Sequence, residues 1–256
     1  MFQIIAYIKF LFKSTNQHGV HSPFVYDLIT NCFYDNTKYK AYLKLSAYRK
    51  FLLQNNSELT ITDYGSGSKI FKSDTRAINA IAKTSGTTQK RAELLFRIVQ
   101  YFKPINTLEL GTSLGIATQA LALGYSKNHI TSIEGCPNSS EFTKKQLSEF
   151  DIKNVEVKTG EFKTILPKLK NNTYDLIFFD GNHTKIATVN YFNELIDKAH
   201  NNSIFIFDDI HWSKGMQDAW DIIKAHPKVT VTIDTFFWGI VSFRKEQVKE
   251  HFKIRV

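Results

Sequence analysis

The chain has 256 residues, of which 43% are hydrophobic and 22% are charged, and this composition is typical of a globular protein with a real core. No segment reaches the ~18–20 consecutive apolar residues of a membrane-spanning helix. The only cysteines, Cys32 and Cys136, form no metal-binding or redox motif. These features argue against an integral membrane protein and a cysteine-based metal site, and we expect a cytoplasmic protein, with peripheral membrane attachment as an alternative.

The formal net charge is +9, and nearly all of it belongs to the first part of the chain. Residues 1–100 hold 14 Lys and Arg against 6 Asp and Glu, whereas the remainder holds 19 against 18. Basic surfaces attract phosphates, nucleic acid and anionic lipid. The N-terminal part therefore either contacts such a partner or is an ordinary solvated basic surface.

The chain begins with a predicted helix at residues 2–13. Its apolar residues fall on one face, with Lys9 and Lys13 beside them. This face could dock on the rest of the protein, on a second copy in a homodimer, or on a membrane surface. A further helix is predicted to begin at Pro23, with Ser22 as its N-cap.

We interpret the next segments as part of an extension of the main domain. Residues 38–54 predict a basic, tyrosine-rich helix, and Asp63-Tyr-Gly-Ser-Gly-Ser68 looks like a glycine-rich nucleotide loop. No strand–helix–strand pattern follows that loop, so we interpret it as a turn or lid. We therefore predict a basic helical extension or lid at residues 1–83 and the main domain at residues 84–256.

The stretch Asn106-Thr-Leu-Glu-Leu-Gly-Thr-Ser-Leu-Gly-Ile-Ala-Thr118 predicts a buried strand, a tight turn and a helix. Such a turn places backbone N–H groups and a helix N-terminus at the carboxyl end of a strand, where open α/β sheets bind nucleotides. Gly111 and Gly115 are four residues apart, unlike the G-x-G-x-x-G pattern of dinucleotide folds. Glu109 would repel a pyrophosphate but suits a ligand that carries an amino group.

Strands and helices alternate regularly from residue 105 onwards, which predicts an α/β fold with a doubly wound, mostly parallel sheet. The chain ends with an antiparallel pair at residues 229–235 and 238–244. We therefore predict seven strands, with an antiparallel terminal hairpin that a six-stranded dinucleotide fold lacks. The first five strands are expected at residues 105–110, 129–134, 154–158, 174–180 and 202–208.

Acidic residues stand at the ends of several predicted strands. Glu134 lies 23 residues after Gly111, in the range for a carboxylate that accepts both ribose hydroxyls. Asp180 ends one apolar strand, and Asp208 with Asp209 ends the next. Three such carboxylates would meet at one edge of the sheet, where they suit Mg²⁺, Mn²⁺ or Ca²⁺. Alternatively, only one faces the pocket and the others cap helices.

The E-x-G-x-x-x-G turn resembles motif I of class I S-adenosylmethionine (SAM) methyltransferases. Residues 90–244 resemble the O-methyltransferase branch related to catechol and caffeoyl-CoA methyltransferases, whereas residues 1–83 do not. The resemblance implies that the cofactor is SAM and that a divalent metal binds Asp180, Asp208 and Asp209, although the family has Asn at the last position. It also implies these cofactor contacts: Glu109, Gly111, Thr112, Ser113, Gly115, Glu134, Gly160, Glu161, Phe162 and Asp180.

The resemblance also suggests where a proton would be removed. The family's catalytic lysine lies three residues after the first metal-binding aspartate, and His183 stands there in this chain, with Lys185 two residues further on. We therefore expect His183 to act as the base beside Asp180, with Lys185 as a further catalytic residue.

The predicted function is methyl transfer from SAM to a hydroxyl oxygen of a small molecule, with divalent-metal assistance. One alternative is a metal-independent methyltransferase acting on nitrogen, lipid or RNA. Another is a non-catalytic module that binds membrane or nucleic acid through the basic N-terminal part. A NAD-dependent dehydrogenase is disfavoured by the glycine spacing and the terminal hairpin.

Overall fold

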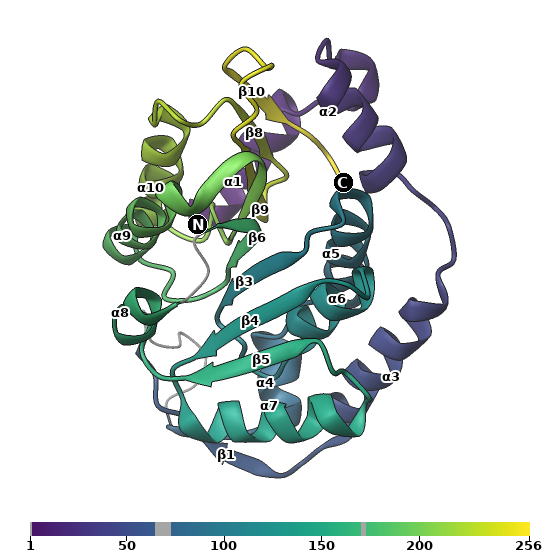
Figure 1. The fold of residues 1–256 in the computed structure, drawn as a ribbon, viewed down its shortest axis with the longest axis vertical. Helices are drawn as coiled ribbons and strands as arrows, with labels where there is room; N and C mark the ends of the chain where they lie inside the picture. The colour runs from purple at the N-terminus through teal and green to yellow at the C-terminus, as the bar shows by residue number, and fades with distance from the viewer. Residues whose placement is uncertain (1, 65–72, 170–172) are drawn as a thin grey trace. The chain divides into compact units, whose positions relative to one another are not determined.

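The computed structural model describes residues 2–64, 73–169 and 173–256 (Figure 1). The chain divides into two compact units. Unit 1 consists of Met1–Tyr34 and Asn171–Val256, and unit 2 consists of Asp35–Lys170. The predicted extension at residues 1–83 is therefore shared between both units.

Unit 2 contains three parallel strands in the order β3-β4-β5, which lie side by side in Figure 1. Leu108 and Leu110 are fully or almost fully buried in β3, as a short apolar strand requires. A separate antiparallel pair, β1 and β2, precedes these strands. The elements of unit 2 are α3 (Lys40–Gln54), β1 (Glu58–Thr60), β2 (Thr75–Ala77), α4 (Ile78–Thr84), α5 (Gln89–Phe102), β3 (Asn106–Leu110), α6 (Ile116–Gly124), β4 (His129–Glu134), α7 (Pro137–Glu149), β5 (Val155–Thr159), α8 (Phe162–Ile165) and a 3₁₀ turn (Leu166–Lys168).

Unit 1 contains five strands in the order β10-β8-β9-β7-β6. The first part of the chain adds α1 (Phe2–Lys13), a 3₁₀ turn (Gln17–Gly19) and α2 (Pro23–Leu28), which a π-helical turn (Ile29–Phe33) continues. The remaining elements are β6 (Tyr174–Phe179), α9 (Lys185–Leu195), a 3₁₀ turn (Ile196–Lys198), β7 (Ala199–Asp208), α10 (Lys214–Ala225), β8 (Val231–Asp234), β9 (Trp238–Ser242) and β10 (Glu250–Lys253).

The predicted fold class is confirmed: the structure is a mostly parallel α/β fold with flanking helices and a helical N-terminus. The terminal hairpin is also confirmed, because β8 and β9 pair antiparallel and β9 pairs antiparallel with β7. The predicted count of seven strands is wrong by one. The eighth strand is β10, which pairs parallel with β8; the polar residues Glu250 and Lys253 at its ends concealed it.

Aromatic side chains pack the last strands of the chain against each other and against α10 in unit 1. Phe207 in β7 stacks on Phe179 in β6, with ring centroids 4.2 Å apart. Trp220 of α10 lies against Gly239 of β9, where a Cβ atom would stand 2.7 Å from the indole ring. The glycine is thus needed for close approach of the helix.

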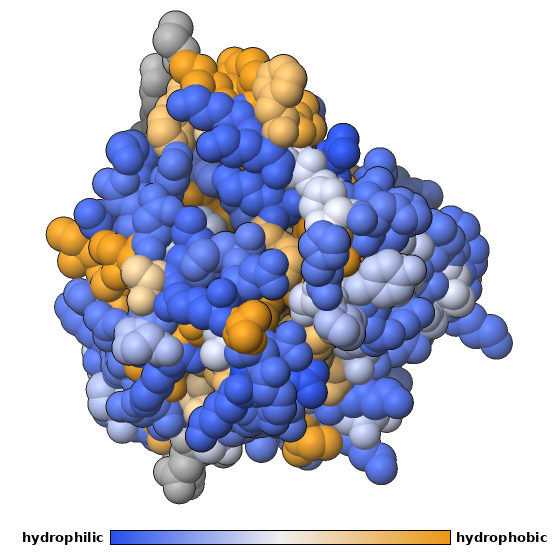
Figure 2. Space-filling model, turned by 90° about the horizontal axis from the view of Figure 1, so that it is seen from above, coloured by the Kyte–Doolittle hydropathy of each residue, from blue (hydrophilic) through white to orange (hydrophobic). Residues whose placement is uncertain are grey.

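Seen from above, the surface is largely hydrophilic, and hydrophobic residues lie in separate groups (Figure 2). Among the residues that the structure describes, no helix has the length and apolar character needed to cross a membrane.

Candidate functional site

The turn between β3 and α6 has an unusual backbone. Gly111, Ser113 and Gly115 all have positive φ angles, at 104°, 48° and 76°. Left-handed conformations favour glycine, and a Cβ on Gly115 would also lie 2.7 Å from Cγ2 of Thr143. The sequence therefore needs glycine at this position both for backbone conformation and for space.

Two side chains that sequence reasoning missed hold this turn. The Tyr48 hydroxyl of α3 donates a hydrogen bond to the Leu114 carbonyl at 2.6 Å, and Thr143 Oγ1 of α7 donates to the Ser113 carbonyl at 2.7 Å. Tyr48 is fully buried, and its burial raises the pKa of the phenol. The sequence analysis predicted a basic, tyrosine-rich helix here, but nothing in the sequence indicates the distant carbonyl.

Glu109 is completely buried beneath the turn. Its Oε2 accepts hydrogen bonds from Thr118 Oγ1 at 2.6 Å and from Ser132 Oγ at 2.5 Å. Its Oε1 has no hydrogen-bond partner among the described residues. Burial raises the pKa of Glu109 to about 7; the two hydroxyl hydrogen bonds oppose this shift, and the charge of Glu134 adds to it.

Glu134 ends β4 and is bound to the same turn. Its Oε2 accepts the Ser113 N–H at 2.7 Å and its Oε1 accepts the Cys136 N–H at 2.8 Å. Burial raises the pKa of Glu134, while the backbone N–H groups counteract that effect. The carboxylate is therefore fixed beside the glycine turn, as expected for a group that receives ribose hydroxyls.

The third segment that was predicted to contact the cofactor, residues 160–162, follows β5. Gly160 has a φ of 145°, and its N–H donates to the Glu134 carbonyl at 2.8 Å. Glu161 precedes α8 and forms an ion pair with Lys163 at 2.8 Å, while Phe162 begins the helix. The backbone thus joins Gly160 to the end of β4. Of the earlier glycine-rich stretch, residues 65–68 lie outside the described residues.

A residue just before that stretch reaches the end of β4. A Cβ on Gly135 would stand only 2.8 Å from the nearest ring atom of Tyr64. Asp63 nearby forms an ion pair with Arg76 at 3.7 Å. The absence of a side chain at Gly135 therefore makes room for Tyr64 next to Glu134.

In unit 1, the structure brings together Asp180, His183 and Asp208. One ligand atom of each lies within 4.8 Å of the others. His183 Nε2 is 3.6 Å from Asp180 Oδ1. Asp180 follows β6 and Asp208 ends β7, two adjacent parallel strands, so this convergence follows from the expected sheet topology.

The other two predicted residues of unit 1 lie differently. Asp209 follows Asp208 in a left-handed conformation, with φ at 54°, and it is not part of the group of three. Lys185 is the first residue of α9, and its Nζ lies 3.8 Å from Asp218 Oδ2 on α10. The group of three therefore contains His183, whereas Asp209 as a metal ligand stays a prediction.

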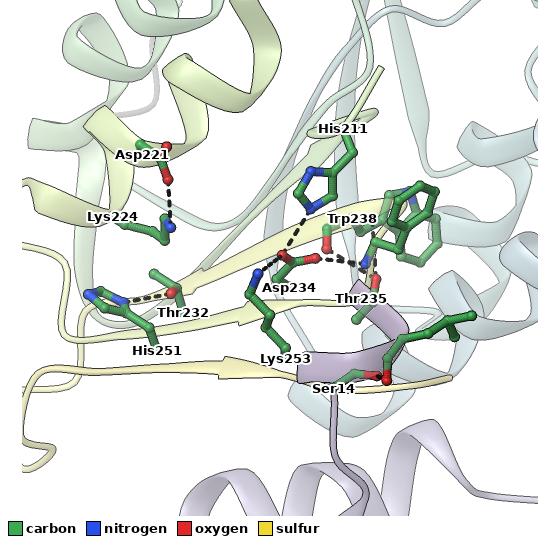
Figure 3. A network of polar contacts seen from close by, with 12 residues as sticks. Ser14, His211, Asp221, Lys224, Thr232, Asp234, Thr235, Trp238, His251 and Lys253 are labelled. Carbon is green, nitrogen blue, oxygen red and sulfur yellow. Dashed lines mark hydrogen bonds and ion pairs between the residues drawn. The ribbon is translucent and has the colours of Figure 1, made fainter. Parts of the chain in front are cut away.

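Another buried polar group follows Asp209 and is drawn in Figure 3. His211 Nε2 lies 2.9 Å from Asp234 Oδ2, and Lys253 Nζ lies 3.7 Å from the same oxygen. Asp234 Oδ1 accepts the Phe236 N–H at 2.8 Å, and the Phe236 ring stacks on His211. Nothing in the sequence indicates this carboxylate partner of His211, because Asp234 lies 23 residues further along the chain.

The residues of both units fit the groups that the resemblance implies. In unit 2, a buried acceptor without a donor at Glu109 Oε1 suits an ammonium group, and Glu134 suits a ribose diol. In unit 1, two carboxylates and an imidazole form a donor set that binds divalent cations.

Comparison with known proteins agrees with this reading. Residues 108–210 match a family model described as "Methyltransferase domain". No curated protein matches the chain. The S-adenosylhomocysteine-bound Podospora anserina methyltransferase PaMTH1 is similar in structure, with a TM-score of 0.62 and 13% identity, over 88% of this chain and 97% of that one.

Two bacterial structures show the same similarity. The Bacillus cereus O-methyltransferase in complex with S-adenosylhomocysteine gives a TM-score of 0.55 at 17% identity, over 82% of this chain and 94% of that one. A Staphylococcus aureus protein named as a candidate caffeoyl-CoA O-methyltransferase gives 0.55 at 17% identity, over 62% and 84%. The predicted resemblance to class I SAM-dependent methyltransferases of this branch is confirmed by the family model and by the shared fold. The individual site residues stay predictions.

Proposed function

We propose that this protein transfers a methyl group from SAM to a hydroxyl oxygen of a small molecule, with a divalent cation held by Asp180, His183 and Asp208. The observation that carries the proposal is the convergence of these three side chains at the ends of adjacent strands. The glycine turn of unit 2, with Glu109 and Glu134, supports SAM as the donor.

A bound divalent cation supplies Lewis acidity, which lowers the pKa of a hydroxyl and prepares it as a nucleophile. Asp180 and Asp208 would hold the cation and balance its charge, and His183 would complete the set. An imidazole ligand favours Mn²⁺ or another transition metal over Ca²⁺. Glu134 would hold the ribose of SAM, and in-line displacement requires the methyl donor and the acceptor oxygen to be aligned.

A small cavity lies beside Asp180, His183 and Asp208. His183 and Asp208 line it, together with Phe179, Tyr191 and Phe207. It has room for about one water molecule, so it indicates no class of organic acceptor, and phenols are simply the first hydroxyl compounds to test.

A metal-independent version is supported by one contact. His183 Nε2 lies 3.6 Å from Asp180 Oδ1, so the carboxylate can orient the imidazole. In this version His183 takes the acceptor's proton and Asp180 stabilises the resulting cation. Chelator-insensitive activity would favour it, and nitrogen, lipid headgroups or RNA would join the acceptors to be tested.

The first experiment is a calorimetric titration with S-adenosylhomocysteine in the presence of Mn²⁺, of Mg²⁺ and of EDTA. We expect binding in all three, because the turn of unit 2 is held by protein groups alone. Absence of binding in every buffer would overturn the methyltransferase proposal.

The second experiment measures transfer of a labelled methyl group from SAM to a panel of phenols. Asp180→Ala should lower turnover by about 100-fold or more, because it removes a cation ligand. Asp197→Ala, an exposed aspartate elsewhere in unit 1, is the matched control. Full activity of Asp180→Ala would refute the cation-assisted mechanism.

A further inference from the structure

The first helix of the chain presents apolar side chains to solvent. In α1, Ile4, Ile8 and Phe12 are 66%, 48% and 88% exposed, and Ile5 and Leu11 are exposed as well. These positions recur at intervals of three and four residues, so they form one continuous stripe along the helix. We call these five residues the outer stripe of α1.

The opposite side of α1 is attached to unit 1. Phe10 is buried, and its ring contacts Phe236 at a centroid distance of 5.6 Å. Tyr7 contacts the same ring edge-on at 4.8 Å. After the helix, Thr15 bridges to Ile254 next to β10. The outer stripe is therefore exposed on a helix whose other side is already packed.

The charged residues beside the outer stripe indicate which kind of partner could cover it. Lys9 and Lys13 are exposed on the flank of α1, and the first acidic residue of the chain is Asp27. A helix with an apolar face, basic flanks and no acid has the properties of helices that lie in the plane of an anionic membrane surface. At 12 residues, α1 is much shorter than the ~20 residues of a membrane-spanning helix.

We propose that α1 binds the surface of an anionic phospholipid bilayer, with the outer stripe inserted among the acyl chains and the two lysines at the headgroups. This inference does not rest on the proposed methyl transfer. It would place the protein at a membrane surface whatever its acceptor is.

The test is flotation of the full chain with vesicles of phosphatidylcholine containing about 30% phosphatidylglycerol, compared with phosphatidylcholine alone. We expect binding to the anionic vesicles, and loss of most of it when salt is raised to about 0.5 M. The double variant Ile4→Ser/Phe12→Ser should bind about tenfold more weakly or worse, because it removes the most exposed part of the stripe.

Matched controls separate the stripe from general effects. Val248→Ser removes a 79% exposed apolar side chain elsewhere in unit 1 and should leave binding unchanged. Lys9→Glu/Lys13→Glu should abolish binding to anionic vesicles, whereas Lys90→Glu/Lys127→Glu, with the same change in net charge, should retain it. Methyl transfer or S-adenosylhomocysteine binding, measured without vesicles, should be unaffected by all four variants.

Three results would overturn the proposal. One is no binding to anionic vesicles, and another is equal binding by wild type and Ile4→Ser/Phe12→Ser. The third is a dimer in light scattering that Ile4→Ser/Phe12→Ser converts to a monomer, since a second copy would then cover the stripe.

Discussion

Two sites stand at the carboxyl ends of parallel strands, yet they are built differently. One is the glycine turn of unit 2, residues 111–115, and the other is the acidic cluster of unit 1, which consists of Asp180, His183 and Asp208. In the turn, Ser113 and Leu114 are held by Thr143, Tyr48 and Glu134 through bonds of 2.6 to 2.7 Å. In the cluster, His183 Nε2 approaches Asp180 Oδ1 to 3.6 Å, and one ligand atom of each of Asp180, His183 and Asp208 lies within 4.8 Å of the others.

Hydrogen bonds from protein groups hold the turn, whereas the cluster brings two carboxylates and an imidazole together at one edge of the strands. Carboxylates that lie together repel unless a cation or a proton stands between them. We therefore expect changes in the turn to alter cofactor binding through shape, and changes in the cluster to alter cation binding through charge. The following predictions test that contrast, from the largest expected effect to the smallest.

Gly115→Ala should damage the turn most. The new Cβ would lie 2.7 Å from Thr143 Cγ2 at a φ of 76°, so we expect a loss of about 2–4 kcal/mol in stability and about 100-fold in S-adenosylhomocysteine affinity. Calorimetry and thermal unfolding measure both. Gly215→Ala is the control, because its Cβ would meet nothing closer than 3.5 Å. Normal affinity in Gly115→Ala would contradict the role assigned to the turn.

Glu109→Gln should raise stability at alkaline pH. The pKa of Glu109 is raised from 4.5 to about 7, so in the wild type its ionisation destabilises the folded state progressively as pH rises from 4.5 to 7. The variant should therefore gain up to about 3 kcal/mol above pH 7 and almost nothing below pH 4.5. Urea unfolding at pH 4.5 and pH 8 measures this, with exposed Glu141→Gln as control. If the variant gained stability only at low pH, the upward direction of the Glu109 pKa shift would be wrong.

Asp208→Asn should separate stability from cation binding. Without divalent cations, removal of one negative charge from the cluster should raise the melting temperature by about 2–4 °C, an effect of about 1 kcal/mol. Addition of Mn²⁺ should raise the melting temperature of wild type but not of the variant. S-adenosylhomocysteine affinity should not change. If Mn²⁺ stabilises both proteins equally, the cation does not bind at Asp208.

Tyr48→Phe should have the smallest effect. It removes the hydroxyl that donates to Leu114, which costs about 1 kcal/mol because the carbonyl loses a buried partner. We expect a loss of about threefold in S-adenosylhomocysteine affinity, measured by calorimetry. Tyr26→Phe, which changes an exposed tyrosine, should leave affinity unchanged. A loss as large as that of Gly115→Ala would mean that Tyr48 does more than support the backbone.

The sequence by itself determined the strands of the sheet apart from β10, the glycine turn and the acidic strand ends. Short apolar runs such as Leu176–Phe179 must be buried, and the spacing of Gly111 and Gly115 admits few turns, so local physical chemistry was sufficient. The parallel topology then implied that Asp180 and Asp208 would lie together, because adjacent parallel strands end at the same edge.

Only the tertiary structure decided which side chains complete each site. His183 lies beside Asp180 and Asp208, and Asp209 follows β7 in a left-handed conformation. Tyr48 and Thr143 reach the glycine turn from helices far away in sequence, and Asp234 meets His211 across 23 residues. Local patterns specify an element and its buried face. The partner of a single polar side chain, in contrast, depends on where distant elements pack, and no spacing in the sequence encodes that distance.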